Sequence, residues 1–193
     1  GIAITDILTG VYAVSGILAA LRVKESTGMG QHVDLSLMDT GVSVMTNQAM
    51  NYLTTGHAPN RMGNRHPNLT PYQVFDCADG WIIIATGNDG QYAKLCKLLG
   101  LDQMIDDPKF VTNAARLENR AEMTARLTAA TVLRTKADLL ADCEAQSVPA
   151  GPINSIGENL TSEHAKARGL VIDPEGVKGV RTRIVFSDAE LSL

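Results

Sequence analysis

A stretch dense in proline, glycine and asparagine, HAPNRMGNRHPNLTPY, separates two parts of the chain that differ in composition. The part before it is rich in glycine, alanine and methionine, whereas the part after it begins with alternating apolar residues and continues with charged segments. Proline, glycine and asparagine favour turns, and so the stretch is predicted to be a long ordered loop. The change in composition predicts a boundary at residues 60–71, between a packed helical region and a smaller α/β unit.

The first part is predicted to be mainly helical. Residues 6–25 mix apolar and small residues, and their basic last turn is followed by Gly28, which predicts a buried helix. Apolar and polar residues alternate in QHVDLSLMD, which predicts a short strand. A second helix is expected after this strand, ending at Gly56.

The second part is predicted to combine a hairpin with several helices. YQVFDCADGWIIIATG predicts a β-hairpin with its turn at residues 78–80 and a buried strand at residues 81–85. An amphipathic helix stopped by Gly100 follows, with further helices in residues 106–147. VPAGPINSIGENL is predicted to be a corner, and the tail a small hairpin with a strand at residues 180–186.

Charge, cysteine usage and hydropathy exclude several classes of protein. The 193 residues carry a net charge of −4 without a Lys/Arg run, which disfavours a nucleic-acid partner. Cys77, Cys96 and Cys143 are scattered, which suits a reducing cytoplasm and indicates neither a zinc site nor disulfides. No apolar run is expected to approach the roughly 20 residues of a membrane span. The start without Met, inside an apolar segment, predicts a fragment or a processed chain.

Asp6 is unusual because it stands among apolar residues in GIAITDILTG. At the start of a helix, free N–H groups and the helix dipole stabilise a carboxylate, which suits a nucleophile or a general base. An ordinary N-cap is the more frequent role for such a residue. Asp34 and Asp39 would lie on opposite faces of the predicted strand, so a carboxylate pair is disfavoured and Asp39 is predicted to be an N-cap.

Two polar loops are candidate binding segments. In GNRHP, Gly63 allows close backbone approach, Asn64 and His66 offer hydrogen bonds, and the proline fixes the chain, which suits a loop that closes over a substrate. A lone histidine before proline is more often structural or exposed. GNDGQ lies between a strand and a helix, but it lacks a phosphate-binding pattern, and Asp89 would repel phosphate.

No motif for a catalytic serine, a zinc protease or a cysteine–histidine pair is present. Physical reasoning alone therefore predicts a soluble α/β protein with a polar, loop-rich cleft, and it does not reach a reaction.

Longer stretches add a resemblance. TDILTGVYAVSGILAALRVKESTGMGQHVDLSLMD, RMGNRHPNLTPYQVF followed by DGWIIIATGNDGQ, and VPAGPINSI occur in this order. Together they closely resemble the family III CoA-transferases, or CaiB/BaiF family, the group of formyl-CoA transferase, carnitine CoA-transferase and α-methylacyl-CoA racemase.

The resemblance implies that Asp6, with Gly10 after it, is the nucleophile of a CoA-transferase that forms aspartyl anhydride and aspartyl-CoA thioester intermediates. A coenzyme A thioester, with succinyl-CoA as an expected donor, and a small carboxylic acid are the implied substrates, without a cofactor or a metal. A lid role is implied for Gly63 and Asn64, and contact with the acceptor acid for His66, Arg61 or Arg65. The racemase branch has an acid where Asp89 falls, which leaves an acyl-CoA racemase or epimerase as an alternative.

The family fold implies part of a Rossmann-like large domain and a smaller α/β domain, in an interlocked homodimer located in the cytoplasm. Residues 1–59 would be the helical part of the large domain with a linker, residues 60–71 a loop, residues 72–149 the small domain, and residues 150–193 a return linker. The isolated chain would then be inactive, since most CoA-binding residues of the family precede it. A further alternative is a piece that acts only in dimer assembly.

Overall fold

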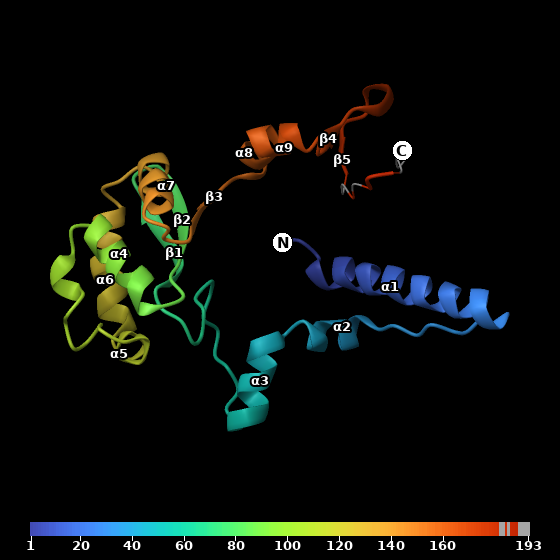
Figure 1. The fold of residues 1–193 in the computed structure, drawn as a ribbon, viewed down its shortest axis with the longest axis horizontal. Helices are drawn as coiled ribbons and strands as arrows, with labels where there is room; N and C mark the ends of the chain where they lie inside the picture. The colour runs from blue at the N-terminus through green and yellow to red at the C-terminus, as the bar shows by residue number, and fades with distance from the viewer. Residues whose placement is uncertain (182–183, 185, 189–193) are drawn as a thin grey trace. The chain divides into compact units, whose positions relative to one another are not determined.

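The chain divides within its polar loop into two units, Gly1–Arg61 and Met62–Leu193. The computed structural model describes residues 1–181, 184 and 186–188 (Figure 1). Each unit is built differently, because the first is helical and the second combines a small sheet with helices.

The first unit begins with the long helix α1, Ile4–Thr27. Gly28 ends this helix in the left-handed conformation, with φ of 75°, and its N–H donates to the Lys24 carbonyl. The predicted helix is therefore confirmed, but its predicted burial is wrong: in the described part of the chain, no α1 side chain is buried. Helix α1 packs on α2, Leu37–Ser43, and the residues of this unit form no second layer over its apolar side chains.

Hydropathy also corrects one expectation for α1. An 18-residue window within its 24 residues has a mean hydropathy of 1.7, so by length and composition alone the helix could cross a membrane. Core helices of enzymes pass the same test, because small and apolar residues serve both environments.

The predicted strand in residues 31–39 is wrong, since residues 29–36 form an extended segment without a strand partner in the described structure. This segment lies close to α1: a Cβ at Gly16 would come within 3.1 Å of Val33 Cγ1. The following helix is also interrupted. Helix α2 ends at Ser43, and α3, Thr46–Thr55, begins after a break and ends at Gly56 as predicted.

The second unit contains a three-stranded antiparallel sheet in the order β1–β2–β3. The predicted hairpin is confirmed as β1, Tyr72–Cys77, and β2, Gly80–Ala85. The prediction of a buried strand at residues 81–85 is only half correct, because alternate residues are buried and Trp81 is exposed. The predicted corner at residues 148–160 instead holds β3, Ala150–Ile153, an edge strand paired with β2.

Helices cover one face of this sheet and enclose the core (Figure 1). Phe75 faces Ile82 across the hairpin, and both are buried, as is Ile84 on the same face. Tyr92, Leu127 and Leu139 contribute to the core from three helices. The helical elements between β2 and β3 are α4 (Asp89–Leu98), η1 (Asp102–Met104), α5 (Asn113–Glu118), α6 (Arg120–Thr131) and α7 (Lys136–Ala145).

The tail holds only short elements. They are α8 (Ile156–Thr161), α9 (Glu163–Ala167), β4 (Val171–Ile172), η2 (Pro174–Gly176) and β5 (Gly179–Val180). Strand β4 pairs with β5, so the predicted small hairpin exists. The strand predicted at residues 180–186 is not formed at residues 184 and 186, and residues 182–183 and 185 lie outside the described residues.

Candidate functional site

Asp6 lies in the first turn of α1 and is exposed. The N-cap of the helix is Ala3, which makes no side-chain capping bond, so the alternative role of Asp6 as N-cap is wrong. A carboxylate in the first turn interacts favourably with the positive end of the helix dipole. Gly10 lies one turn further on the same face, where a Cβ would meet no atom within 4 Å. The carboxylate of Asp6 is therefore accessible, with open space beside it.

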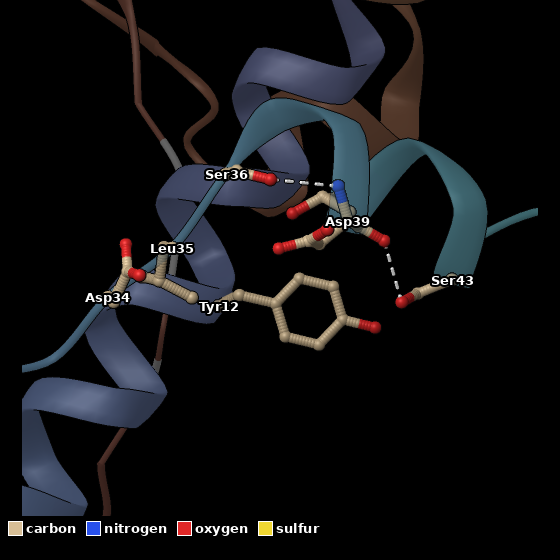
Figure 2. A pocket seen from close by; sticks show the side chains of 7 residues that line it. Tyr12, Asp34, Leu35, Ser36, Asp39 and Ser43 are labelled. Atoms are coloured by element: carbon tan, nitrogen blue, oxygen red, sulfur yellow. Dashed lines mark hydrogen bonds between the residues drawn. The ribbon is translucent and has the colours of Figure 1, made fainter.

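A pocket of about 240 Å³ lies within the first unit (Figure 2). The seven residues that line it are Tyr12, Asp34, Leu35, Ser36, Asp39, Thr40 and Ser43, and Asp6 is not among them. Asp39 is not the N-cap of α2, because Ser36 holds that position and its Oγ accepts the Asp39 N–H at 3.0 Å. Asp34 and Asp39, expected on opposite strand faces, border the same pocket because the segment between them is not a strand.

The loop before β1 carries four of the predicted site residues, Arg61, Gly63, Asn64 and His66. Gly63 adopts φ of 65°, a left-handed conformation that costs glycine little. Asn64 accepts the Val74 N–H through Oδ1 at 3.0 Å, which ties the turn to β1. The Arg65 Nε–H donates to the Met62 carbonyl at 3.0 Å. The predicted loop is thus ordered by hydrogen bonds from its own side chains.

His66 is fixed in the same loop by its backbone and its ring. Its N–H donates to the Tyr72 carbonyl at 3.0 Å, and its ring stacks on that of Tyr72 with centroids 5.1 Å apart. Nδ1 accepts the N–H groups of Asn68 and Leu69, both at 3.1 Å. Because backbone N–H groups only donate, Nδ1 is an acceptor, and the neutral ring carries its hydrogen on Nε2.

Asp89 has a protein partner that the sequence did not reveal. Its Oδ1 accepts from Arg116 Nη2 at 2.6 Å. Arg116 is buried and also donates to the carbonyls of Thr70 and Phe110, at 2.9 and 2.8 Å. Its guanidinium lies over the Tyr92 ring, 4.3 Å from the centroid. No pattern in the sequence distinguishes Arg116 from the arginines of the neighbouring helix, so its importance is visible only in the structure.

The predicted site residues fall into both units. Asp6 and Arg61 belong to the first unit, and Arg61 is exposed without a hydrogen-bond or ion-pair partner among the described residues. Gly63, Asn64, His66 and Asp89 belong to the second unit. There, Arg116 connects Asp89 to the loop at Thr70. Within the described ranges, no group of three His, Cys, Asp or Glu side chains could hold a metal ion.

Comparison with known sequences shows the family of this chain. The sequence family described as "CoA-transferase family III" matches residues 1–192, and the chain therefore belongs to this family. The resemblance seen in the sequence and the expected helix-rich α/β fold class are thereby confirmed.

Individual relatives give the comparison more detail. The chain is 45% identical to the succinate–glutarate CoA-transferase of Agrobacterium fabrum, over 99% of this chain and 49% of that protein. It is 36% identical to the succinyl-CoA:glutarate CoA-transferase of Mus musculus, over 90% of this chain and 40% of that protein. A CaiB/BaiF family protein from Brucella suis has a similar structure, with a TM-score of 0.85 and 50% identity over 100% of this chain and 51% of that chain. The chain spans about half the length of the curated relatives it matches.

Proposed function

We propose that this chain carries the nucleophile of a CoA-transferase that moves CoA from an acyl-CoA to a small carboxylic acid. One observation supports the proposal most strongly: Asp6 lies in the first turn of α1, exposed, with open space beside Gly10. Two similar proteins are named for succinate or succinyl-CoA and glutarate, which supports succinyl-CoA as donor and a small dicarboxylic acid as acceptor.

In the proposed reaction the carboxylate of Asp6 attacks the thioester carbonyl of the donor. The C–S bond breaks, which gives a mixed anhydride and CoA thiolate. The thiolate then attacks the Asp6 carbonyl of the anhydride, which releases the donor acid and leaves an aspartyl-CoA thioester. Each step exchanges one acyl bond for another, so no oxidant, metal or resident cofactor is needed.

The acceptor acid completes the transfer in two further steps. Its carboxylate attacks the aspartyl thioester, which forms a second anhydride and frees the thiolate again. Attack of this thiolate on the acceptor's carbonyl gives the new acyl-CoA and restores the carboxylate of Asp6. Both kinds of intermediate react with water, so the working site must exclude it.

The loop residues are proposed to bind the acceptor acid. The Nε2–H of His66 is a hydrogen-bond donor, and Arg61 supplies an exposed positive charge. Gly63 and Asn64 would shape the part of the loop that covers the substrate. Asp89 uses Oδ1 for Arg116, so its proposed substrate contact falls to Oδ2. We further propose a cytoplasmic homodimer.

Trapping of the intermediate tests this mechanism. The intact protein is incubated with succinyl-CoA and treated with hydroxylamine, and the peptide that contains Asp6 is analysed by mass spectrometry. A hydroxamate at Asp6 is expected, together with a loss of transfer to glutarate in D6A of roughly 10³-fold or more. D34A serves as a matched control that removes another exposed aspartate.

Two results would contradict the proposal. Full transfer activity in D6A would exclude Asp6 as nucleophile. Exchange of the α-hydrogen of a 2-methylacyl-CoA for deuterium, with no acceptor acid present and no hydroxamate formed, would indicate the racemase alternative.

A further inference from the structure

Three side chains from α5 and α6 reach the same short segment of the loop before β1. Asn113 and Arg116 are three residues apart on α5, a spacing that places their side chains on one face, and Arg120 is the first residue of α6. The segment they contact is residues 66–70, more than 40 positions earlier in the sequence.

Five hydrogen bonds join these side chains to the loop backbone. Arg120 donates to the carbonyls of His66 and Pro67, at 2.9 and 3.1 Å. Asn113 Nδ2 donates to the Asn68 carbonyl at 2.8 Å, and Asn113 Oδ1 accepts the Thr70 N–H at 3.1 Å. Arg116 Nε donates to the Thr70 carbonyl at 2.9 Å. Four of the five carbonyls of the segment are therefore held by side chains from outside the loop.

Arginine is an unusual residue for binding two neutral backbone carbonyls, as Arg120 does here. Among the described residues it has no carboxylate within ion-pair distance, and its side chain is partly buried. Burial, and secondarily the charge of Arg65, lower the pKa of Arg120 from its ordinary value. A planar fork that grips two successive carbonyls explains an arginine here, since a lysine presents a single point of attachment.

His66 is held at most of its hydrogen-bonding groups. Its N–H, its carbonyl and its Nδ1 are all engaged, and one ring face stacks on Tyr72. In the described part of the protein, Nε2–H is the hydrogen-bonding group of His66 left without a partner. A donor fixed in this way needs no reordering when it meets a carboxylate.

We propose that Asn113, Arg116 and Arg120 form a clamp that sets the conformation of residues 66–70, and that Arg120 is a positioning residue that keeps the Nε2–H of His66 ready to donate to the acceptor acid. This role deepens the proposed function and rests on it. The acceptor is a small carboxylic acid, recognised through its free carboxylate.

The test compares R120M with R126M in the intact protein. Arg126 lies on the same helix but pairs with Glu122, and in the described structure it makes no hydrogen bond to the loop, so R126M removes a guanidinium from α6 without opening the clamp. Three quantities are measured: the KM for glutarate, the rate of CoA loading onto Asp6 from succinyl-CoA, and hydrogen exchange in the peptide covering residues 62–74.

For R120M we expect a KM for glutarate raised about tenfold, and exchange in this peptide faster by about the same factor. The rate of CoA loading should stay unchanged, because loading precedes acceptor binding. R126M should match the unsubstituted protein in all three measurements. R120K, which keeps the charge and one of the two bonds, should fall between them, and it provides the comparison if R120M does not fold.

An unchanged KM and unchanged exchange in both Arg120 variants would overturn the clamp. Slower loading in R120M with an unchanged KM would likewise contradict a role in positioning the acceptor. If the unsubstituted protein never loads CoA onto Asp6, the proposed function fails, while the exchange measurement still decides whether Arg120 orders the loop.

Discussion

Arg116 donates to Asp89 at 2.6 Å, yet the two side chains differ greatly in exposure: 1% for Arg116 and 60% for Asp89. The arginine is surrounded by protein and has further acceptors in the carbonyls of Thr70 and Phe110. The aspartate stands largely in water, which screens its charge. The two partners should therefore contribute unequally to stability.

The first prediction concerns this inequality. R116M should lower the free energy of unfolding by about 3 kcal/mol or more, because it leaves buried carbonyls without donors and removes a packed cation. D89N should cost about 1 kcal/mol or less, because the exposed carboxylate is largely screened and Arg116 keeps its other acceptors. Urea unfolding followed by circular dichroism measures both values.

K109M is a suitable control, since Lys109 pairs with Glu122 while half-exposed. Its effect should stay within about 0.5 kcal/mol. Equal losses in R116M and D89N would show that the ion pair itself, rather than the buried arginine, stabilises this region.

The second prediction concerns the three buried thiols. Burial raises the pKa of Cys77, Cys96 and Cys143, and that of Cys143 reaches about 11. Because thiolates rather than thiols react with iodoacetamide, all three should resist alkylation at pH 8 in the folded protein and react in urea. Mass spectrometry of the alkylated peptides gives the result, and rapid alkylation of Cys143 without denaturant would contradict it.

These raised pKa values also fix a sign for stability. The neutral thiol of Cys143 contributes fully to the free energy of unfolding below its ordinary pKa of 9.0. This contribution is lost as the pH rises through about 11.

Local patterns predicted the parts of the fold whose causes are local. The hairpin of β1 and β2 follows from a short turn between alternating apolar residues, and the end of α4 follows from Gly100. Strand β3 was missed because Gly151 and Pro152 resemble a turn, and only pairing with β2 makes them a strand. The opposite error occurred at residues 31–39, where alternation is present but a partner strand is not described.

The candidate site shows the same division. The loop residues Gly63, Asn64 and His66 could be selected from the sequence because glycine, asparagine and histidine suggest hydrogen bonding and close approach. The clamp could not be selected from the sequence, because Asn113, Arg116 and Arg120 look like ordinary polar residues of exposed helices. Their role depends on a loop that lies far away in the sequence.

The third prediction concerns pH and the start of α8. Ser155 and Glu158 form a capping box, in which the Ser155 N–H donates to Glu158 at 2.7 Å. This bond, the Ser155 side chain and Lys136 lower the pKa of Glu158 to about 2. The contribution of ionised Glu158 to the free energy of unfolding should therefore be complete at pH values above its ordinary pKa of 4.5. It should disappear as the pH falls through about 2.

A carboxyl-detected NMR titration measures the pKa of Glu158 directly. S155A should raise that pKa part of the way to 4.5, because the contribution of the Ser155 side chain is lost while its backbone N–H still donates to the Glu158 carboxylate. S162A removes the N-cap of the next helix, α9, and should leave the pKa of Glu158 unchanged. A pKa that does not respond to S155A would exclude the Ser155 side chain as a cause of the shift.

Strand β3 has a consequence for how the protein is made. Strand β2 is the central strand of the sheet, but its second neighbour is supplied by residues 150–153, after all the helices of the core have been synthesised. A nascent chain emerging from the ribosome therefore carries an open β-edge for about half of the synthesis of this unit, and open edges pair readily with other chains. Residues 150–153 pair with this edge of β2 only late in the synthesis of the polypeptide.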